Sequence, residues 1–259
     1  MATIDAALQR GRKVFFLYPH SVLNEELLIE ILSHEYEVYA LHNHDAAVKV
    51  AAANPGSILF VNIDDTLKEH QWEAWIRRLI SNPQTSSTKV GIVTYNPNEQ
   101  LARKYLMDMM LPCGFIQLKQ GLAEGKRIIL KTLDANEARG RRRFVRAQCN
   151  DPKKASLNVT VKGKFITGAI LDISVAGMTF HLDEPVVMKP ETLLEDIQLR
   201  LKGTLCRVTG ILAGAGGGQG HYLLMFANPV AEDIKEKVHR FIYSTLQEQI
   251  DDFIRGRRG

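Results

Sequence analysis

The spacing of apolar residues changes near residue 135 of this 259-residue chain. Before that point, short apolar runs typical of buried strands alternate with segments whose apolar residues recur every three to four positions, as on one face of a helix. After it, apolar and polar residues alternate with a period of two over several consecutive segments. A chain with this change of period is predicted to contain two domains of different structural class.

The first part of the chain carries strand and helix patterns in strict alternation. The expected strands cover residues 13–19, 37–42, 57–64, 89–96 and 114–119. The expected helices cover residues 24–35, 45–54, 70–81, 98–111 and 124–136, and Asn24 is a suitable N-cap for the first of them. Strands separated by helices pair in parallel and are covered on both faces. We therefore expect an α/β domain of the flavodoxin-like (βα)5 type over residues 1–135.

The second part reads as consecutive strands followed by one long helix. The expected strands cover residues 156–163, 165–174, 177–183, 194–203, 204–214 and 221–228. Strands without intervening helices pair antiparallel, and their number and length suit a small all-β barrel. Residues 229–255 follow Asn228 as a cap, begin with Pro229, and repeat apolar residues from Ile234 to Phe253 at helical spacing. We expect this barrel and its closing helix over residues 147–259.

Composition limits the compartment in which such a chain works. The hydrophobic content of 45% and the charged content of 24% are ordinary values for globular domains. No apolar run is long enough to cross a bilayer, and the N-terminal residues lack the features of a signal peptide. Cys113, Cys149 and Cys206 are scattered and odd in number, which suits small buried side chains in a reducing cytoplasm. We expect a cytoplasmic protein with no membrane insertion.

Two short motifs stand at and after the junction of the two parts. The first is RGRRRFVR at residues 139–146, in which five of eight residues are arginine although the formal net charge of the chain is only +4. The second is LDISVAGMTF at residues 171–180, where a strand ends, turns and starts again. We expect residues 136–146 to form an arginine-rich linker arm. By itself, such an arm is typical of a solvated linker or a nonspecific polyanion site, and the second motif of a turn capped by Asp172 and Ser174.

Together the two motifs resemble the PilZ domain, from about residue 139 to residue 250. That family carries RxxxR on an N-terminal arm and D/NxSxxG on the barrel, which here correspond to Arg142 and Arg146, and to Asp172, Ser174 and Gly177. The resemblance implies a bacterial receptor for the second messenger cyclic di-GMP. A guanidinium can pair with a phosphate or with the O6 and N7 atoms of guanine, and it can stack on a purine. Asp172 and Ser174 offer an acceptor and a hydroxyl, and Gly177 permits close backbone approach.

The arginine motif has two possible registers. Arg139 and Arg143 also satisfy RxxxR, but the pair Arg142 and Arg146 is preceded by Arg141 and so matches the RRxxxR form that is frequent in the family. In the family, an arginine at the position of Arg141 accompanies binding of two stacked ligand molecules. The resemblance therefore implies ligand contacts from Arg141, Arg142 and Arg146 and two cyclic di-GMP molecules per PilZ domain.

The first part resembles the receiver domain of response regulators, but its reactive positions are altered. The phosphoacceptor position at the end of the third strand falls on Asn62, and the acidic pair that binds Mg²⁺ is absent after the first strand. An amide cannot form an acyl phosphate, and Mg²⁺ requires carboxylate oxygens. We expect a pseudo-receiver that serves as an interaction module. Asp64 or Asp65 would substitute only if the strand were shifted.

Other residues at the edges of this domain have ordinary structural explanations. Thr94 and Lys119 match the conserved receiver positions at the ends of the fourth and fifth strands, but we interpret them as strand-end polar residues. HNHD at residues 42–45 favours surface histidines over a metal site, since adjacent residues rarely bind a metal without a distant partner. GAGGGQG at residues 214–220 follows a strand pattern of the second part and favours a hairpin over a phosphate loop.

These features predict a bacterial signalling protein with no catalysis, cofactor or metal of its own. Cyclic di-GMP is expected to order the arm, change the orientation of the two domains, and so signal to a protein effector. One alternative is a nucleic-acid-binding module that uses the arginine run and the basic tail at residues 255–258, which steep salt dependence would reveal. A second alternative is a PilZ-like scaffold that binds only protein.

Overall fold

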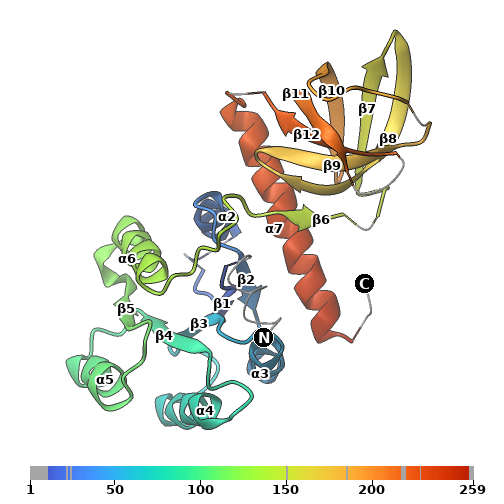
Figure 1. The fold of residues 1–259 in the computed structure, drawn as a ribbon. Coiled ribbons are helices and arrows are strands. Elements are labelled where there is room, and N and C mark those ends of the chain that lie inside the picture. Colours follow the sequence, from blue (N-terminus) through green and yellow to red (C-terminus); the bar gives the residue numbers. More distant parts are fainter. Residues whose placement is uncertain are drawn as a thin grey trace. The chain divides into compact units, whose positions relative to one another are not determined.

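The computed structural model describes residues 11–21, 23, 25–149, 151–184, 186–216, 220–227 and 229–256. The chain forms two compact units, which meet in sequence at the arginine run, with Arg143 in the first unit and Phe144 in the second (Figure 1). The predicted caps Asn24 and Asn228, residues 217–219 of the glycine run and residues 257–258 of the tail lie outside the described residues. Within the described part, no helix is both long and apolar enough to cross a membrane.

The first unit contains a five-stranded parallel sheet in the order β2-β1-β3-β4-β5. Its strands are β1 (Val14–Leu17), β2 (Val38–Leu41), β3 (Ile58–Asn62), β4 (Lys89–Thr94) and β5 (Phe115–Gln117). Nearly every residue of β1, β3 and β4 is buried, as expected of strands covered on both faces. This strand order is that of flavodoxin-like domains, so the predicted fold of the first part is confirmed.

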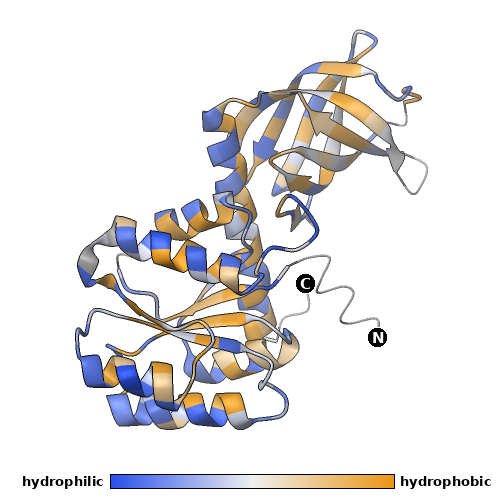
Figure 2. Cartoon of the chain, turned by 60° about the vertical axis from the view of Figure 1, so that its left-hand side comes forward, coloured by the Kyte–Doolittle hydropathy of each residue, from blue (hydrophilic) through white to orange (hydrophobic). Residues whose placement is uncertain are grey.

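Helices cover both faces of this sheet. They are α2 (Glu25–Ser33), α3 (His44–Ala53), α4 (Glu69–Ser81), α5 (Glu99–Arg103) and α6 (Leu122–Ala135). Helices α2 and α6 lie on one face, and α3, α4 and α5 lie on the other (Figure 1). Figure 2 shows hydrophobic strands in the centre of this unit and hydrophilic residues along the outer faces of the helices. The hydrophobic core therefore fills the two layers between the sheet and its helices.

One predicted helix differs from its expected form. Residues 98–111 were expected as one α-helix, but α5 continues as the π-helical segment η1 (Lys104–Asp108), in which Met109 N donates to Lys104 O at 3.0 Å. The Lys104 ammonium lies 3.0 Å from Glu69 Oε1 and 2.7 Å from Glu73 Oε2 on α4. The π-helical turn thus begins at Lys104, whose ammonium is bound by two carboxylates of the neighbouring helix α4.

The second unit is an antiparallel barrel. Its sheet has the order β6-β8-β7-β10-β11-β12-β9, and a further pairing of β8 with β9 closes it. The strands are β6 (Ala147–Gln148), β7 (Ala155–Val161), β8 (Lys164–Ser174), β9 (Gly177–Leu182), β10 (Leu193–Leu201), β11 (Thr204–Gly216) and β12 (His221–Phe226). The alternation of buried and exposed residues along β7 and β12 matches the predicted period of two. The predicted barrel is confirmed, and the two-residue strand β6 is an addition to it.

The long helix α7 (Glu232–Ile254) follows the barrel. Val238, Phe241, Ile242, Leu246 and Ile250 are buried at the predicted helical spacing, whereas Phe253 is about half exposed. Ion pairs tie the helix to the barrel, because Glu248 lies 3.1 Å from Lys154 and 2.9 Å from Lys202. The predicted closing helix is therefore confirmed.

Candidate functional site

The DISVAG motif forms the hairpin that joins β8 to β9. Ser174 and Gly177 are its last paired residues, and the turn consists of Val175 and Ala176. Ser174 is only 3% exposed. Its hydroxyl donates to Gly177 O and accepts from Ala176 N, both at 3.3 Å. In this structure the hydroxyl of Ser174 therefore holds the turn.

Gly177 is required by close contact with a neighbouring strand. A Cβ atom at this position would lie 2.2 Å from Leu224 O and 3.1 Å from Met225 Cα, both on β12. No real Cβ makes a contact of 2.2 Å, so any larger residue would displace the β9–β12 pairing. The predicted close backbone approach at Gly177 is thus made by another strand of the barrel.

Arg146 and Asp172 are brought together by the short strand β6. Arg146 immediately precedes β6, which pairs with the end of β8 and places Gln148 opposite Asp172. The Arg146 Nη1 atom lies 3.5 Å from Asp172 Oδ1. The two side chains are 47% and 26% exposed, so this contact lies at the surface of the barrel. Burial and the nearby charge of Asp172 raise the pKa of Cys149 to about 12.

The remaining arginines of the run differ from one another. Arg139 belongs to the first unit: its guanidinium lies 4.9 Å from the centre of the Tyr36 ring and 3.8 Å from Asp134 Oδ1. Arg141 and Arg142 are exposed and form no ion pair or hydrogen bond to any other residue that the structure describes. Among the described residues, these two arginines are therefore available for a ligand, whereas Arg139 is already engaged.

Polar residues at the carboxyl ends of β1, β3 and β4 in the first unit hydrogen-bond to one another. Asn62 is buried, donates to Tyr18 O at 2.8 Å and accepts from Asp64 N at 2.9 Å. The carboxylate of Asp64 folds back over the end of the sheet, where it accepts a hydrogen bond from the Thr94 hydroxyl and one from Tyr95 N at 2.6 Å. Asn62, Asp64 and Tyr95 line a pocket of about 760 Å³ together with His20 and Tyr18, whereas Thr94 is buried behind it.

His20 completes the environment of Asp64. Its Nε2 atom lies 3.3 Å from Asp64 Oδ2, and its Nδ1 atom lies 3.4 Å from the amide nitrogen of Asn62. Nε2 of His20 faces Asp64 within ion-pair distance but outside hydrogen-bond geometry. Burial alone would raise the pKa of Asp64, but the nearby His20 ring and the hydrogen bonds from Thr94 and Tyr95 N outweigh it and lower this pKa.

Sequence reasoning missed this bond between Asp64 and Thr94. Thr94 was expected only as a strand-end polar residue, and Asp64 lies two residues past Asn62, the last residue of β3. Lys119, on the 3₁₀ segment η2 (Leu118–Gln120), is exposed. No three His, Cys, Asp or Glu side chains gather as metal ligands within the part of the chain that is described.

Comparison with known proteins identifies the barrel. Residues 140–244 match the family model of the PilZ domain, so this part of the chain is a PilZ domain. A search of curated proteins found no match. The matched region includes Arg141, Arg142, Arg146 and the whole DISVAG hairpin.

Several solved structures are similar to parts of this chain. The PilZ domain of YcgR from Escherichia coli with c-di-GMP is 14% identical over 46% of this chain and 99% of that chain, with a TM-score of 0.38. The K. pneumonia MrkH–c-di-GMP complex is 18% identical over 46% of this chain and 57% of that chain, with a TM-score of 0.34. The pilus assembly protein CpaE from Caulobacter crescentus is 17% identical over 48% of this chain and 95% of that chain, with a TM-score of 0.34.

Proposed function

We propose that the PilZ domain of this chain is a non-catalytic receptor for cyclic di-GMP. The observation that supports the proposal is that the match to the PilZ family spans residues 140–244, the part of the chain in which both expected motifs lie. Arg146 and Asp172, one from each motif, lie side by side at the surface of the barrel. Two further arginines, Arg141 and Arg142, are exposed and unpaired among the described residues.

The chemistry of these side chains suits a cyclic dinucleotide. The ligand presents two phosphates and two guanines, and guanidinium groups bind both by paired hydrogen bonds and by stacking. Asp172 can accept from the donors on the Watson–Crick edge of guanine, while Gly177 and Ser174 fix the hairpin that carries it. Each hydrogen bond to a charged group contributes about 1.5–3 kcal/mol. Micromolar affinity requires about 8 kcal/mol, which three or four such contacts and base stacking can supply.

The stoichiometry in this proposal is two ligand molecules for each PilZ domain. Its basis is Arg141, which immediately precedes the Arg142–Arg146 pair and is exposed. A second stacked molecule presents additional phosphates, and a third guanidinium on the same arm can bind them. The expected consequence is a binding ratio near two in the wild type that falls toward one in Arg141→Ala.

The first unit acts in this proposal as a pseudo-receiver that binds a protein effector. Asn62 stands at the phosphoacceptor position, and the nearest carboxylate, Asp64, is held by Thr94, Tyr95 N and His20. A carboxylate so engaged is a poor nucleophile for phosphoryl transfer. The unit is therefore expected to remain unlabelled by acetyl phosphate under conditions that phosphorylate ordinary receivers.

Ligand binding is proposed to signal through the arginine arm. The arm is one place where the chain passes from one unit to the next, since Arg143 and Phe144 belong to different units, and a second crossing follows Phe253. A ligand that orders Arg141, Arg142 and Arg146 restricts the backbone at this junction and changes the relative orientation of the units. Small-angle scattering with and without cyclic di-GMP tests this step, and superimposable profiles would contradict it.

Calorimetric titration of cyclic di-GMP into the full chain tests the receptor function. We expect saturable binding in the wild type, a loss of about 2 kcal/mol or about thirtyfold in affinity in Arg142→Ala, and unchanged binding in Arg139→Ala. Arg139 is the matched control because it lies in the same run but is engaged by Tyr36 and Asp134. GTP is the control ligand.

Two other outcomes would contradict the proposal. Binding that any polyanion displaces, with a steep dependence on salt, would favour a nucleic-acid-binding arm. Absence of heat with cyclic di-GMP would favour a PilZ scaffold that binds only protein.

A further inference from the structure

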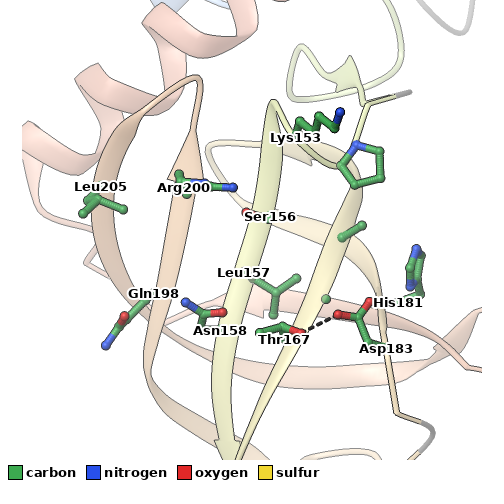
Figure 3. Close-up of a pocket in the computed structure, with 13 residues that line it drawn as sticks. Lys153, Ser156, Leu157, Asn158, Thr167, His181, Asp183, Gln198, Arg200 and Leu205 are labelled. Carbon is green, nitrogen blue, oxygen red and sulfur yellow. Dashed lines mark hydrogen bonds between the residues drawn. The ribbon is translucent and has the colours of Figure 1, made fainter.

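The outer wall of the barrel contains a hollow of about 650 Å³ that is separate from the two motifs. It lies across β7, β8 and β10, and its rim reaches β9 and β11 (Figure 3). None of the six residues predicted to contact cyclic di-GMP lines it among the residues that the structure describes. A volume of this size is typical of sites for small molecules.

Small residues on paired strands create the hollow. Ser156 of β7 pairs with Ala169 of β8, and both face outward between larger side chains. Gly168 lies between Thr167 and Ala169 and pairs with the buried Leu157, so only its backbone reaches this outer face. The small side chains of Ser156 and Ala169 therefore leave the floor of the hollow open.

Two cations without partners stand over this floor. Arg200 is directly opposite Ser156 in the β7–β10 pairing, and its side chain extends toward that residue in Figure 3. Lys153 lies in the loop before β7 at the same end of the hollow. Both side chains are exposed, and neither forms an ion pair or hydrogen bond with any described residue.

Most other cations of the barrel are neutralised. The paired ones are Lys154 and Lys202 with Glu248, Lys164 with Glu184, and Arg207 with Asp196. Arg207 is the most informative of these, because it lies one strand away from Arg200 on the same outer face. Lys153 and Arg200 thus place two positive charges at one end of the cavity that no described carboxylate pairs with.

The opposite end offers neutral groups and an acceptor. Asn158 and Gln198 lie directly opposite each other on β7 and β10, and among the described residues their carboxamides have no hydrogen-bond partner. At the far rim, Asp183 accepts a hydrogen bond from the Thr167 hydroxyl and keeps its second oxygen available to the cavity (Figure 3). One end thus attracts an anion, and the other can recognise a group that carries both donors and acceptors.

We propose that this hollow binds a nucleotide, with the phosphate held by Arg200 and Lys153 and the base held by Asn158 and Gln198. Carboxamides read base edges because each presents a donor and an acceptor side by side. A long nucleic acid would need a row of many cations, and only two converge here. A protein partner would need a cluster of aromatic or large apolar side chains at the centre, where instead Ser156, Gly168 and Ala169 lie.

Ligand-observed NMR titration of the full chain with GMP and AMP tests this assignment. We expect saturable binding of at least one of the two, competition by inorganic phosphate, and markedly weaker binding of guanosine or adenosine. Arg200→Ala is expected to raise Kd about tenfold or more, because it removes a charged hydrogen-bond donor from the phosphate. Arg207→Ala is the matched control and should bind as the wild type, since its guanidinium is paired with Asp196.

The outcomes separate this site from the cyclic di-GMP site. Excess cyclic di-GMP should leave the bound mononucleotide in place, and Arg200→Ala should retain whatever cyclic di-GMP binding the wild type has. No saturable mononucleotide binding, equal affinity in Arg200→Ala and wild type, or displacement by cyclic di-GMP would each overturn the proposal. Equal binding of the nucleosides and the nucleotides would also overturn it, because the phosphate end would then contribute nothing.

Discussion

Two aspartates near strand ends, one in each unit, differ in how many hydrogen bonds and ion pairs their carboxylates form within the protein. Asp64 follows β3 of the parallel sheet, and both of its oxygens are engaged by Thr94, Tyr95 N and His20 from its own unit. Asp172 near the end of β8 has nearly the same exposure, 26% against 24% for Asp64, but among the described residues its carboxylate has one arginine 3.5 Å away as its only partner. The two carboxylates therefore differ in how many partners they have within the protein, and Asp172 keeps more of its acceptor capacity.

The arginines repeat this contrast within one short run. Arg139 is held over the Tyr36 ring beside Asp134, and burial together with the bond to Asp134 raises the pKa of Tyr36 to about 12. Arg141 and Arg142 have no such partners among the described residues. The run thus contains one arginine that contacts its own unit and two that are exposed without such contacts, and only the three-dimensional surroundings distinguish them.

The largest effect on stability and ligand binding is expected from a substitution that disrupts the hairpin carrying Asp172. Gly177→Ala places a Cβ against Leu224 O and should destabilise the barrel by about 3 kcal/mol, with loss of cyclic di-GMP binding. Gly214→Ala on β11 is the control, since a Cβ there has open space and should cost less than about 1 kcal/mol.

Circular dichroism during urea unfolding measures this difference. Trp72 and Trp75, the two tryptophans of the chain, both lie on α4 and report on the first unit alone. Their fluorescence transition should be unchanged in Gly177→Ala. Equal stability of the two glycine variants would show that the close strand contact is not a constraint.

The next largest effect on cyclic di-GMP binding is expected from a substitution of Asp172. Asp172→Asn should weaken cyclic di-GMP binding by about 2 kcal/mol, because a charged acceptor at the ligand surface is lost. Its effect on stability should be below about 1 kcal/mol, since the ion pair with Arg146 is exposed to solvent. Calorimetry and urea unfolding measure the two quantities, and the reverse pattern would assign Asp172 a purely structural role.

Asp64→Asn should affect stability and leave ligand binding unchanged. We expect unchanged cyclic di-GMP binding and a loss of about 1–2 kcal/mol in the stability of the first unit at pH 7, followed by tryptophan fluorescence. The pKa of Asp64 is lowered in the folded state, so its stabilisation is present above about pH 4 and is lost as the pH falls through the folded pKa. The difference between wild type and variant should therefore shrink in acid, and a constant difference would contradict this role.

The smallest effect concerns the helix that follows the barrel. Glu248→Gln removes the charge that Lys154 and Lys202 bind, and should cost less than about 1 kcal/mol because these side chains are partly exposed. Burial alone would raise the pKa of Glu248, but the bonds to both lysines lower it. Salt should reduce the wild-type stability toward that of the variant, and a salt-independent loss would point to packing instead.

The helices and strands of both units could be predicted from the spacing of their apolar residues. That spacing depends on which faces of an element are buried, and a helix and a strand each give a recognisable pattern. The two-residue strand β6 has no period to detect, yet its pairing with β8 brings Arg146 to Asp172. The bond between Asp64 and Thr94 could not be predicted from the sequence either, since it joins the loop after β3 to the last residue of β4, thirty residues later.

The motif residues were predictable only as a set. A family pattern named Arg142, Arg146, Asp172 and Gly177, but the strand that Gly177 faces is revealed by the register of β9 with β12. The hollow beneath Arg200 likewise depends on which residues are opposite one another across three strands. Such cross-strand neighbours are distant in sequence, so periodicity carries no information about them.

Hydrogen–deuterium exchange of the full chain with and without cyclic di-GMP tests the central contrast most directly. Peptides that cover residues 141–148 and 171–177 should be protected by the ligand, and exchange at residues 62–65 and 94–96 should be unchanged. Protection at the Asp64 site, or no protection in either motif, would contradict a first unit closed by its own hydrogen bonds and a second unit open to the ligand.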